Sequence, residues 1–161
     1  MTVQRGYMIK LAKEKEKIVG VFGLNRTGEA AYRALKESGT ETICYDDSEK
    51  TRAEFAKKYG TDALKPITDE IWKKAHKIII SPGVPTTLPQ PHAVVNLAKK
   101  LEIPFIGDID ILCMARANAE YIAITGTNGK STTTALVHHI LAKDKNIWDI
   151  GGNIGNAVLN M

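Results

Sequence analysis

The chain has 161 residues, of which 25% are charged, with a formal net charge of +4. Because the lysines are spread along the sequence with acidic residues among them, this charge argues against a nucleic-acid-binding surface. No apolar run reaches membrane-spanning length and the N-terminal residues lack the apolar core of a signal peptide, so we expect a cytoplasmic protein that does not enter a membrane.

A strand, a glycine-rich turn and a helix follow the charged N-terminal residues. The apolar run from Ile18 to Phe22 predicts a short buried strand, and the turn from Gly23 to Gly28 leads into a helical pattern from Glu29 to Glu37. A second strand is predicted over Thr42 to Tyr45, before a helix over Lys50 to Tyr59. This alternation indicates an α/β domain with a parallel sheet.

The turn after the first strand carries part of a dinucleotide-binding fingerprint. In that pattern, G-x-G-x-x-G, the glycines allow close approach to a pyrophosphate, and an acid about 20 residues further on binds ribose hydroxyls. Asp46 lies at about that distance, but Asn25 stands at the middle glycine. This motif alone favours a nucleotide site and a plain helix-packing turn about equally.

Two further strands complete the expected sheet. The third, Lys77 to Ile80, runs into a loop rich in turn residues, Ser81 to Pro85. Ligands bind at this carboxyl edge of open α/β sheets. A helix from His92 to Leu101 precedes the last strand, Ile103 to Ile106. The sequence therefore predicts a Rossmann-like domain over residues 1–107.

Residues 108–161 are expected to begin a second α/β unit around a phosphate-binding loop. The strand predicted over Tyr121 to Thr125 breaks into Gly126-Thr127-Asn128-Gly129, and Lys130-Ser131-Thr132 opens a helical pattern. Backbone N–H groups of such a turn and a helix N-terminus converge on phosphate oxygens. In this pattern the lysine reaches the terminal phosphates and the following hydroxyl binds Mg²⁺. Ile124 stands where the standard motif has its first glycine, so the loop is a variant.

Three further features are less specific. A third glycine-rich turn, Gly151 to Gly155, contains Asn153, which ordinary turn chemistry explains. Cys44 and Cys113 are far apart and each lies inside an apolar segment, so we expect reduced core thiols rather than a disulfide or a metal site. The adjacent His138-His139 pair lacks the spacing for a shared zinc ion.

Four short motifs are specific when they are taken together. In chain order they are Ser-Pro-Gly-Val at 81–84, Gly-Asp-Ile-Asp at 107–110, Gly-Thr-Asn-Gly-Lys-Ser-Thr at 126–132 and Gly-Gly-Asn-Ile-Gly at 151–155. This combination resembles the Mur ligases, the ATP-dependent ligases of peptidoglycan synthesis. Within the family the pattern is most similar to the member that adds D-glutamate to UDP-N-acetylmuramoyl-L-alanine, because the sibling that adds L-alanine usually has histidine at the position of Asn128.

The resemblance implies a three-domain enzyme that works as a monomer. Residues 1–107 would form its UDP-binding domain and residues 108–161 the start of its ATP-binding domain. ATP would phosphorylate the free carboxylate of the nucleotide-linked alanine, and the amine of D-glutamate would then attack the acyl phosphate. The remaining metal ligands and the amino-acid domain of the family would lie beyond Met161, so we expect this chain to be a fragment that is inactive alone.

Carried over by position, the resemblance implies roles for individual residues. The ATP-binding loop would consist of Gly126, Thr127, Asn128, Gly129, Lys130, Ser131 and Thr132, with Lys130 as catalytic residue and Ser131 as Mg²⁺ ligand. The substrate-binding residues would be Arg26 and Thr27 at the diphosphate, Asp46, Asp47 and Gly83 around uracil and ribose, Asn153 near the reacting end, and Ser81 in the same loop as Gly83.

Three alternatives stay open beside this interpretation. One is a non-catalytic dinucleotide-binding module with nicotinamide as ligand, which Asn25 and the Ser-Pro-Gly loop disfavour. Another is a phosphate-loop ATPase or GTPase with a switch role, but no guanine-reading or Walker-B-like segment precedes Met161. The third is a sibling Mur ligase that adds a different amino acid.

Overall fold

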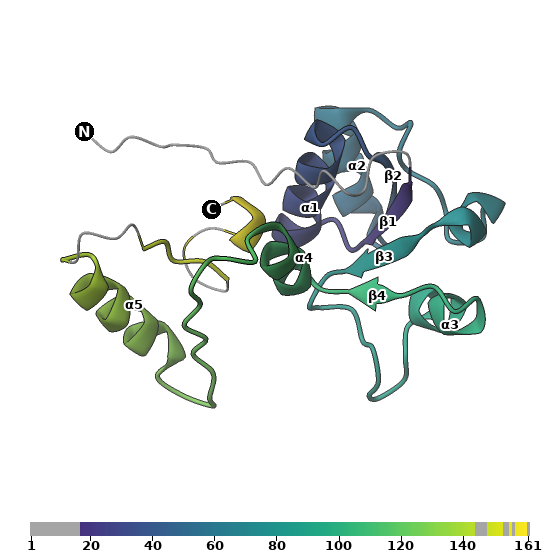
Figure 1. The fold of residues 1–161 in the computed structure, drawn as a ribbon. Helices are drawn as coiled ribbons and strands as arrows, with labels where there is room; N and C mark the ends of the chain where they lie inside the picture. Colours follow the sequence, from purple (N-terminus) through teal and green to yellow (C-terminus); the bar gives the residue numbers. More distant parts are fainter. Residues whose placement is uncertain (1–16, 144–147, 153–154, 156, 161) are drawn as a thin grey trace.

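The computed structural model describes residues 17–143, 148–152, 155 and 157–160 (Figure 1). Its centre is a four-stranded parallel sheet in the order β2-β1-β3-β4. The strands are β1 (Ile18–Phe22), β2 (Glu41–Tyr45), β3 (Lys77–Ile80) and β4 (Phe105–Ile106). The expected α/β class with a parallel sheet is therefore confirmed. Among the described residues, no helix has the length and apolar character that crossing a membrane requires.

Helices connect the strands and cover both faces of the sheet. α1 (Arg26–Glu37) follows β1, α2 (Glu49–Tyr59) follows β2, and α3 (Ala93–Lys100) follows β3. A short 3-10 helix, η2 (Glu70–Lys74), precedes β3. α1 and α2 pack on one face, whereas η2 and α3 pack on the other (Figure 1). The strands are thus buried on both sides, which explains their nearly continuous apolar sequences.

Alternation along the strands divides the apolar side chains between two cores. Val19 and Val21 of β1 pack toward α1, whereas Phe22 packs with Val94 and Val95 of α3. Successive strand side chains point to opposite faces, so neighbours in sequence enter different cores. Cys44 lies in the α1 core as predicted, and burial raises the pKa of its thiol.

Trp72 of η2 anchors the core on the α3 face and has no exposed surface. Its indole Nε1 donates to the carbonyl of Lys65 at 2.9 Å. A Cβ added at Gly20, in the middle of β1, would lie 2.7 Å from Cζ3 of this ring. The glycine inside the strand is therefore explained by the close approach of the indole to the sheet.

Residues from the second half of the chain complete the core on the α1 face. α4 (Asp108–Ala115) contributes Ile111 and Leu112, and the segment that leads into the 3-10 helix η3 (Val158–Asn160) contributes Ala157. Val158 and Leu159 of η3 are buried in the same core. In addition, the guanidinium of Arg33 on α1 donates to Oδ1 of Asn160 at 2.8 Å.

Helix α5 (Lys130–Leu141) forms where the sequence predicts it, but none of its residues is buried. Figure 1 shows it apart from the sheet. The strand predicted over Tyr121 to Thr125 is absent: these residues have no ladder partner within the described part of the chain, and Tyr121 and Ile122 are 46% and 55% exposed. A strand requires a neighbour to accept and donate its backbone hydrogen bonds, which an apolar sequence alone does not provide.

Two other predictions need correction. Cys113 was expected in a core, but it is exposed. It follows Ile111 and Leu112 on α4, and the helical rotation that turns those two toward α1 turns Cys113 away. Helix α1 begins at Arg26, earlier than the predicted Glu29, because Asn25 is already the extended N-cap residue.

Candidate nucleotide-binding site

The loops at the carboxyl ends of the strands enclose a cavity of about 540 Å³. Six residues predicted to bind substrate line it: Arg26 and Thr27 after β1, Asp46 and Asp47 after β2, and Ser81 and Gly83 after β3. The connections from β1 and β2 lead to opposite sides of β1, and ligands of open α/β sheets bind at such a switch point. The seventh predicted residue, Asn153, lies outside the described residues, although its neighbour Gly152 lines the cavity.

The glycine turn at the cavity brings α1 close to the strand end. A Cβ at Gly28 would lie 1.7 Å from the carbonyl oxygen of Gly23, so only glycine permits this approach. Gly23 itself has φ +87°, which side chains disfavour. Asn25, which replaces the middle glycine of the fingerprint, has φ −67° and ψ −170°. This is an ordinary extended conformation, so the substitution leaves the turn intact.

Arg26 places a positive charge at the N-terminus of α1. Its guanidinium donates to the carbonyl oxygen of Gly152, and to that of Gly155 at 3.4 Å. These carbonyls belong to the third glycine-rich turn, which is distant in sequence. The cavity therefore has a cation beside a helix N-terminus, and both favour an anionic ligand such as a diphosphate.

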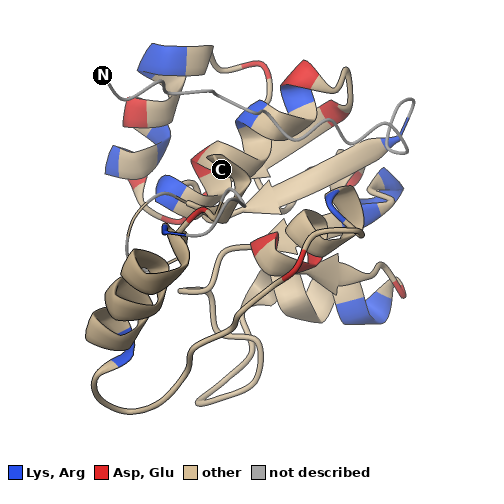
Figure 2. Cartoon of the chain, turned by 60° about the vertical axis from the view of Figure 1, so that its left-hand side comes forward, with Lys and Arg blue, Asp and Glu red and all other residues tan. Residues whose placement is uncertain are grey.

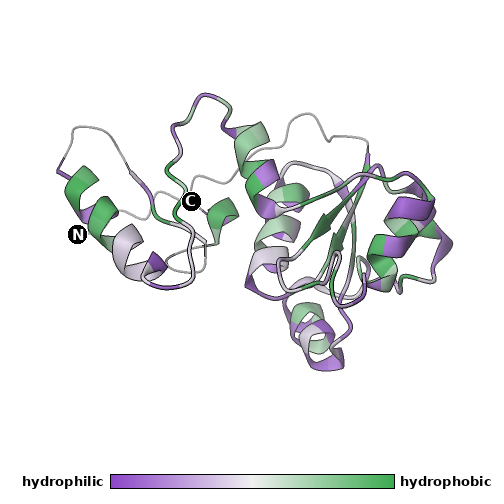
Figure 3. Ribbon diagram, turned by 90° about the horizontal axis from the view of Figure 1, so that it is seen from below, coloured by the Kyte–Doolittle hydropathy of each residue, from purple (hydrophilic) through white to green (hydrophobic). Residues whose placement is uncertain are grey.

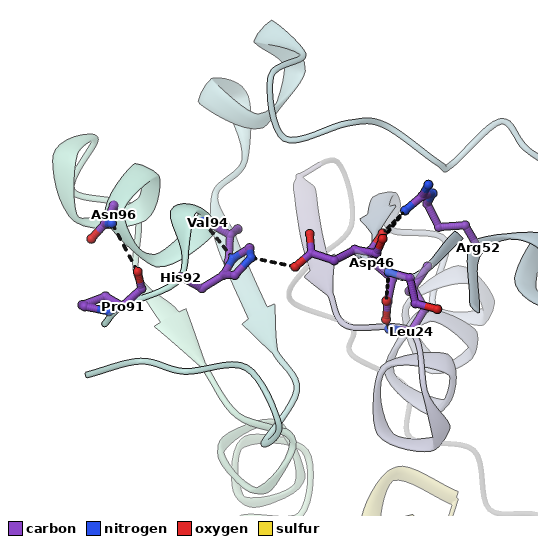
Figure 4. Close-up of polar contacts among 9 residues, drawn as sticks. Leu24, Asp46, Arg52, Pro91, His92, Val94 and Asn96 are labelled. Carbon is purple, nitrogen blue, oxygen red and sulfur yellow. Dashed lines mark hydrogen bonds and ion pairs between the residues drawn. The ribbon is translucent and has the colours of Figure 1, made fainter. Parts of the chain in front are cut away.

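Asp46 is only 7% exposed, and both of its carboxylate oxygens accept backbone hydrogen bonds (Figure 4). Oδ2 accepts from the N–H of Leu24 at 2.7 Å, and Oδ1 accepts from the N–H of Ser48 at 2.8 Å. This carboxylate therefore ties the turn after β2 to the turn after β1. Beyond the ligand-binding role expected from sequence, Asp46 shapes the cavity wall.

Asp47 presents a more accessible carboxylate, with 65% of its side chain exposed. Its Oδ2 lies 2.8 Å from Nε2 of His92, which the sequence did not indicate as a site residue. Arg52 on α2 donates to the carbonyl oxygens of Asp46 and Asp47 at 2.6 and 2.8 Å. The turn after β2 is thus held from both sides of the sheet, by Arg52 of α2 and by His92 at the start of α3.

The loop after β3 and the start of α4 complete the lining. The Ser81 hydroxyl donates to the carbonyl of Gly23 at 2.7 Å, so this predicted residue joins two loops of the wall. A Cβ at Gly83 would meet no atom within 4 Å, which leaves open space at this position. Asp108 also lines the cavity, and burial raises the pKa of its carboxyl. Sequence reasoning missed Asp108 as a site residue, although it belongs to one of the four motifs.

The predicted phosphate loop does not line this cavity. Gly126 and Gly129 have φ +144° and +75°, and Gly129 is the N-cap of α5. The ammonium of Lys130 donates to the carbonyls of Gly126 and Thr127, the latter at 3.2 Å. The remaining predicted ATP-binding residues are exposed: Asn128, Ser131 and Thr132. Within the described residues no three His, Cys, Asp or Glu side chains form a group that could hold a metal ion.

A parallel sheet with a cation and two acids around a cavity at its carboxyl edge is the arrangement in which open α/β domains bind their ligands. Comparison with curated proteins gives a narrower result. The chain is similar to UDP-N-acetylmuramoylalanine–D-glutamate ligases: 44% identical over 144 residues to that of Rickettsia prowazekii, covering 89% of this chain and 31% of the relative. The ligase of Mesorhizobium japonicum is 43% identical over 159 residues, covering 96% and 34% respectively. These relatives confirm the resemblance to the Mur ligases, and the chain spans about a third of their length.

Two other comparisons add little. No protein-family model matches the chain. Among solved structures, shikimate dehydrogenase from Aquifex aeolicus has a TM-score of 0.47 and 14% identity, covering 67% of this chain and 51% of that one.

Proposed function

We propose that the chain binds UDP-N-acetylmuramoyl-L-alanine in the cavity, as part of an ATP-dependent ligase that adds D-glutamate in peptidoglycan synthesis. The observation that carries this proposal is the convergence of six predicted residues, from three separate loops, on one cavity. The relatives named for this ligase support the identity of the substrate. Because the chain spans about a third of their length, we expect no D-glutamate-dependent ADP release from it alone.

The charges of the cavity orient the proposed ligand. The diphosphate lies at Arg26 and Thr27, where a guanidinium and the N-terminus of α1 stabilise negative charge. The uridine lies toward Asp46 and Asp47, since carboxylates accept hydrogen bonds from N–H and O–H groups but repel phosphates. Gly83 leaves room beside them.

The residues of the phosphate loop fit a nucleoside triphosphate with Mg²⁺. The positive φ angles of Gly126 and Gly129 and the start of a 12-residue helix provide the backbone for phosphate binding. Lys130 would exchange its two carbonyl partners for phosphate oxygens, and the Ser131 hydroxyl would hold Mg²⁺. When bound, ATP supplies the phosphoryl group that activates the substrate carboxylate.

We further infer which ligand each part of the chain binds. Residues 1–107 form the UDP-binding domain, and residues 108–161 begin the ATP-binding domain. We expect the protein to work as a monomer, as the resemblance to the Mur ligases implies. We place the protein in the cytoplasm, since its proposed substrates are a nucleotide-linked sugar and ATP.

Calorimetric titration of the chain tests the proposal. UDP-N-acetylmuramoyl-L-alanine and UDP should both bind, and nicotinamide adenine dinucleotide should not. Arg26→Ala should weaken both nucleotides, because it removes the cation of the cavity. Binding of the dinucleotide alone would favour the dinucleotide-binding module instead. If neither UDP nor the UDP-sugar binds, the proposed substrate site is rejected.

A further inference from the structure

We propose that His92 is a positioning residue, which holds the Asp47 carboxylate ready to accept a hydrogen bond from the nucleoside of the bound ligand. This inference rests on the proposed binding of a UDP-sugar in the cavity. His92 is not among the residues that line the cavity, whereas Asp47 is. The role of His92 is therefore exerted through its neighbour.

The backbone of Asp47 is fixed independently of His92. Arg52 donates from Nη1 to the carbonyls of Asp46 and Asp47, and its guanidinium carbon lies 4.9 Å from the centre of the Tyr45 ring. The Asp46 carboxylate holds the N–H of Ser48 on the other side of the turn. These contacts do not fix the side chain of Asp47, which projects from the fixed backbone with most of its surface exposed.

The imidazole of His92 is itself held firmly. Nδ1 accepts from the N–H of Val94 at 3.2 Å, as the N-cap of α3 (Figure 4). The ring packs against Phe22 with centroids 4.6 Å apart, and the backbone N–H donates to Pro85 at 2.9 Å. Because Nδ1 accepts, the neutral ring carries its proton on Nε2 and donates it to Oδ2 of Asp47.

This arrangement prepares one carboxylate oxygen for a ligand. His92 occupies Oδ2 of Asp47, while Oδ1 has no hydrogen-bond partner in the described part of the chain. An acceptor at the cavity pairs with a ligand O–H or N–H, and both occur in the nucleoside: the ribose hydroxyls and the uracil N3–H. Fixing the carboxylate before the ligand arrives removes the entropy cost of ordering it on binding.

The test uses His92→Asn in the full chain. Asparagine is a favoured N-cap residue, so it preserves the cap of α3, but it is too short to reach Asp47. In calorimetric titrations UDP should bind about three- to tenfold more weakly, since the carboxylate must be ordered on binding. Inorganic pyrophosphate, which has no nucleoside, should bind this variant and the unchanged chain equally. Thermal unfolding of each variant verifies that it is folded.

Two further variants separate positioning from a general effect. In an Asp47→Asn background, His92→Asn should cause no additional loss of UDP affinity, because the interaction that it removes is already absent. His76→Asn is the matched control. This histidine precedes β3 at the amino-terminal ends of the strands, opposite the cavity, so its replacement should leave UDP affinity unchanged. Additive losses in the double variant would overturn the proposal.

The ligand donor is identified with two analogues. If the His92→Asn variant and the unchanged chain bind 2′-deoxy-UDP with equal affinity, Asp47 accepts a hydrogen bond from the ribose. If they bind N3-methyl-UDP with equal affinity, Asp47 accepts from the base. Equal UDP affinity of variant and unchanged chain would overturn the role of His92, as would a loss of the same size for pyrophosphate. No UDP binding by the unchanged chain would instead reject the proposed function.

Discussion

The apolar side chains are buried in the sheet and the helices packed on it (the sheet unit), but are largely exposed in helix α5. Val21, Ile78 and Trp72 are fully buried within the sheet unit, whereas Leu136 and Ile140 of α5 are each 57% exposed. Figure 3 shows stretches of hydrophobic residues, coloured green, along the ribbon of α5. The helix is specified by local signals, such as its start after the left-handed Gly129, while the strands depend on distant neighbours.

The two regions also differ in charge. Figure 2 shows positive and negative residues side by side over the helices that cover the sheet. In α5, Lys130 at the first position is the only Lys, Arg, Asp or Glu. Substitutions in the two regions should therefore have separable effects, on folding and the cavity in the first and on nucleotide phosphates in the second.

The largest expected contrast is between Trp72 and Leu136. Trp72→Ala should lower the free energy of unfolding by about 3–5 kcal/mol, because it empties the centre of a core. Leu136→Ala, at an exposed side chain of α5, should change it by less than about 0.5 kcal/mol. Urea unfolding followed by circular dichroism measures both values. Losses of similar size would show that α5 is as well packed as the sheet.

A second contrast lies between two glycines in the loops around the cavity. Gly28→Ala should destabilise the chain by about 1–3 kcal/mol, because the new methyl group would collide with the carbonyl of Gly23. Gly83→Ala meets no atom within 4 Å and should leave the free energy of unfolding nearly unchanged. The same unfolding experiment compares them. A stable Gly28→Ala variant would contradict the close approach of α1 to the glycine turn.

The third contrast concerns the two cations at helix N-termini. Arg26→Ala should weaken UDP binding about tenfold or more, since it removes a charge-assisted contact to the diphosphate. Lys130→Ala should leave UDP affinity intact, because the phosphate loop does not line the cavity, and should weaken ATP binding. Calorimetry with each nucleotide checks this division. A loss of UDP binding on replacement of Lys130 would show that the two sites are not separate.

The smallest effect is expected at Asp108, whose buried carboxyl has a raised pKa. A raised pKa means that the folded state binds the proton more tightly than the unfolded state, so this group favours folding in acid. Its contribution is lost as the pH rises from the unfolded to the folded pKa. Asp108→Asn should therefore stabilise the chain slightly at neutral pH and not in acid. Melting temperatures across this range test the sign, and a gain that grows on acidification would contradict it.

Local patterns were enough to predict most of the sheet unit. Apolar runs gave β1, β2 and β3 nearly to the residue, since buried parallel strands are continuous in sequence. The cavity residues followed from motifs at strand ends, such as Asp46 and Asp47. Domain limits and individual site roles stay predictions.

Contacts between segments that are distant in sequence could not be predicted from local patterns. Nothing local indicates that His92 meets Asp47, or that Arg26 reaches the carbonyl of Gly152, because each contact is created by the folded chain. The 3-10 helix η2 was also missed, since such short elements carry little periodicity. The predicted strand over Tyr121 to Thr125 was wrong because a strand needs a neighbour.

The burial of residues 157–159 beside α1 has a consequence for synthesis on the ribosome. Strand β4 ends at Ile106, so the sheet can pair well before this segment is translated. At about 10 residues per second, the nascent chain waits for several seconds with the apolar surface of Leu24 and Leu35 incompletely covered. Vectorial synthesis thus orders the assembly of this core: the sheet first, the covering of α1 last.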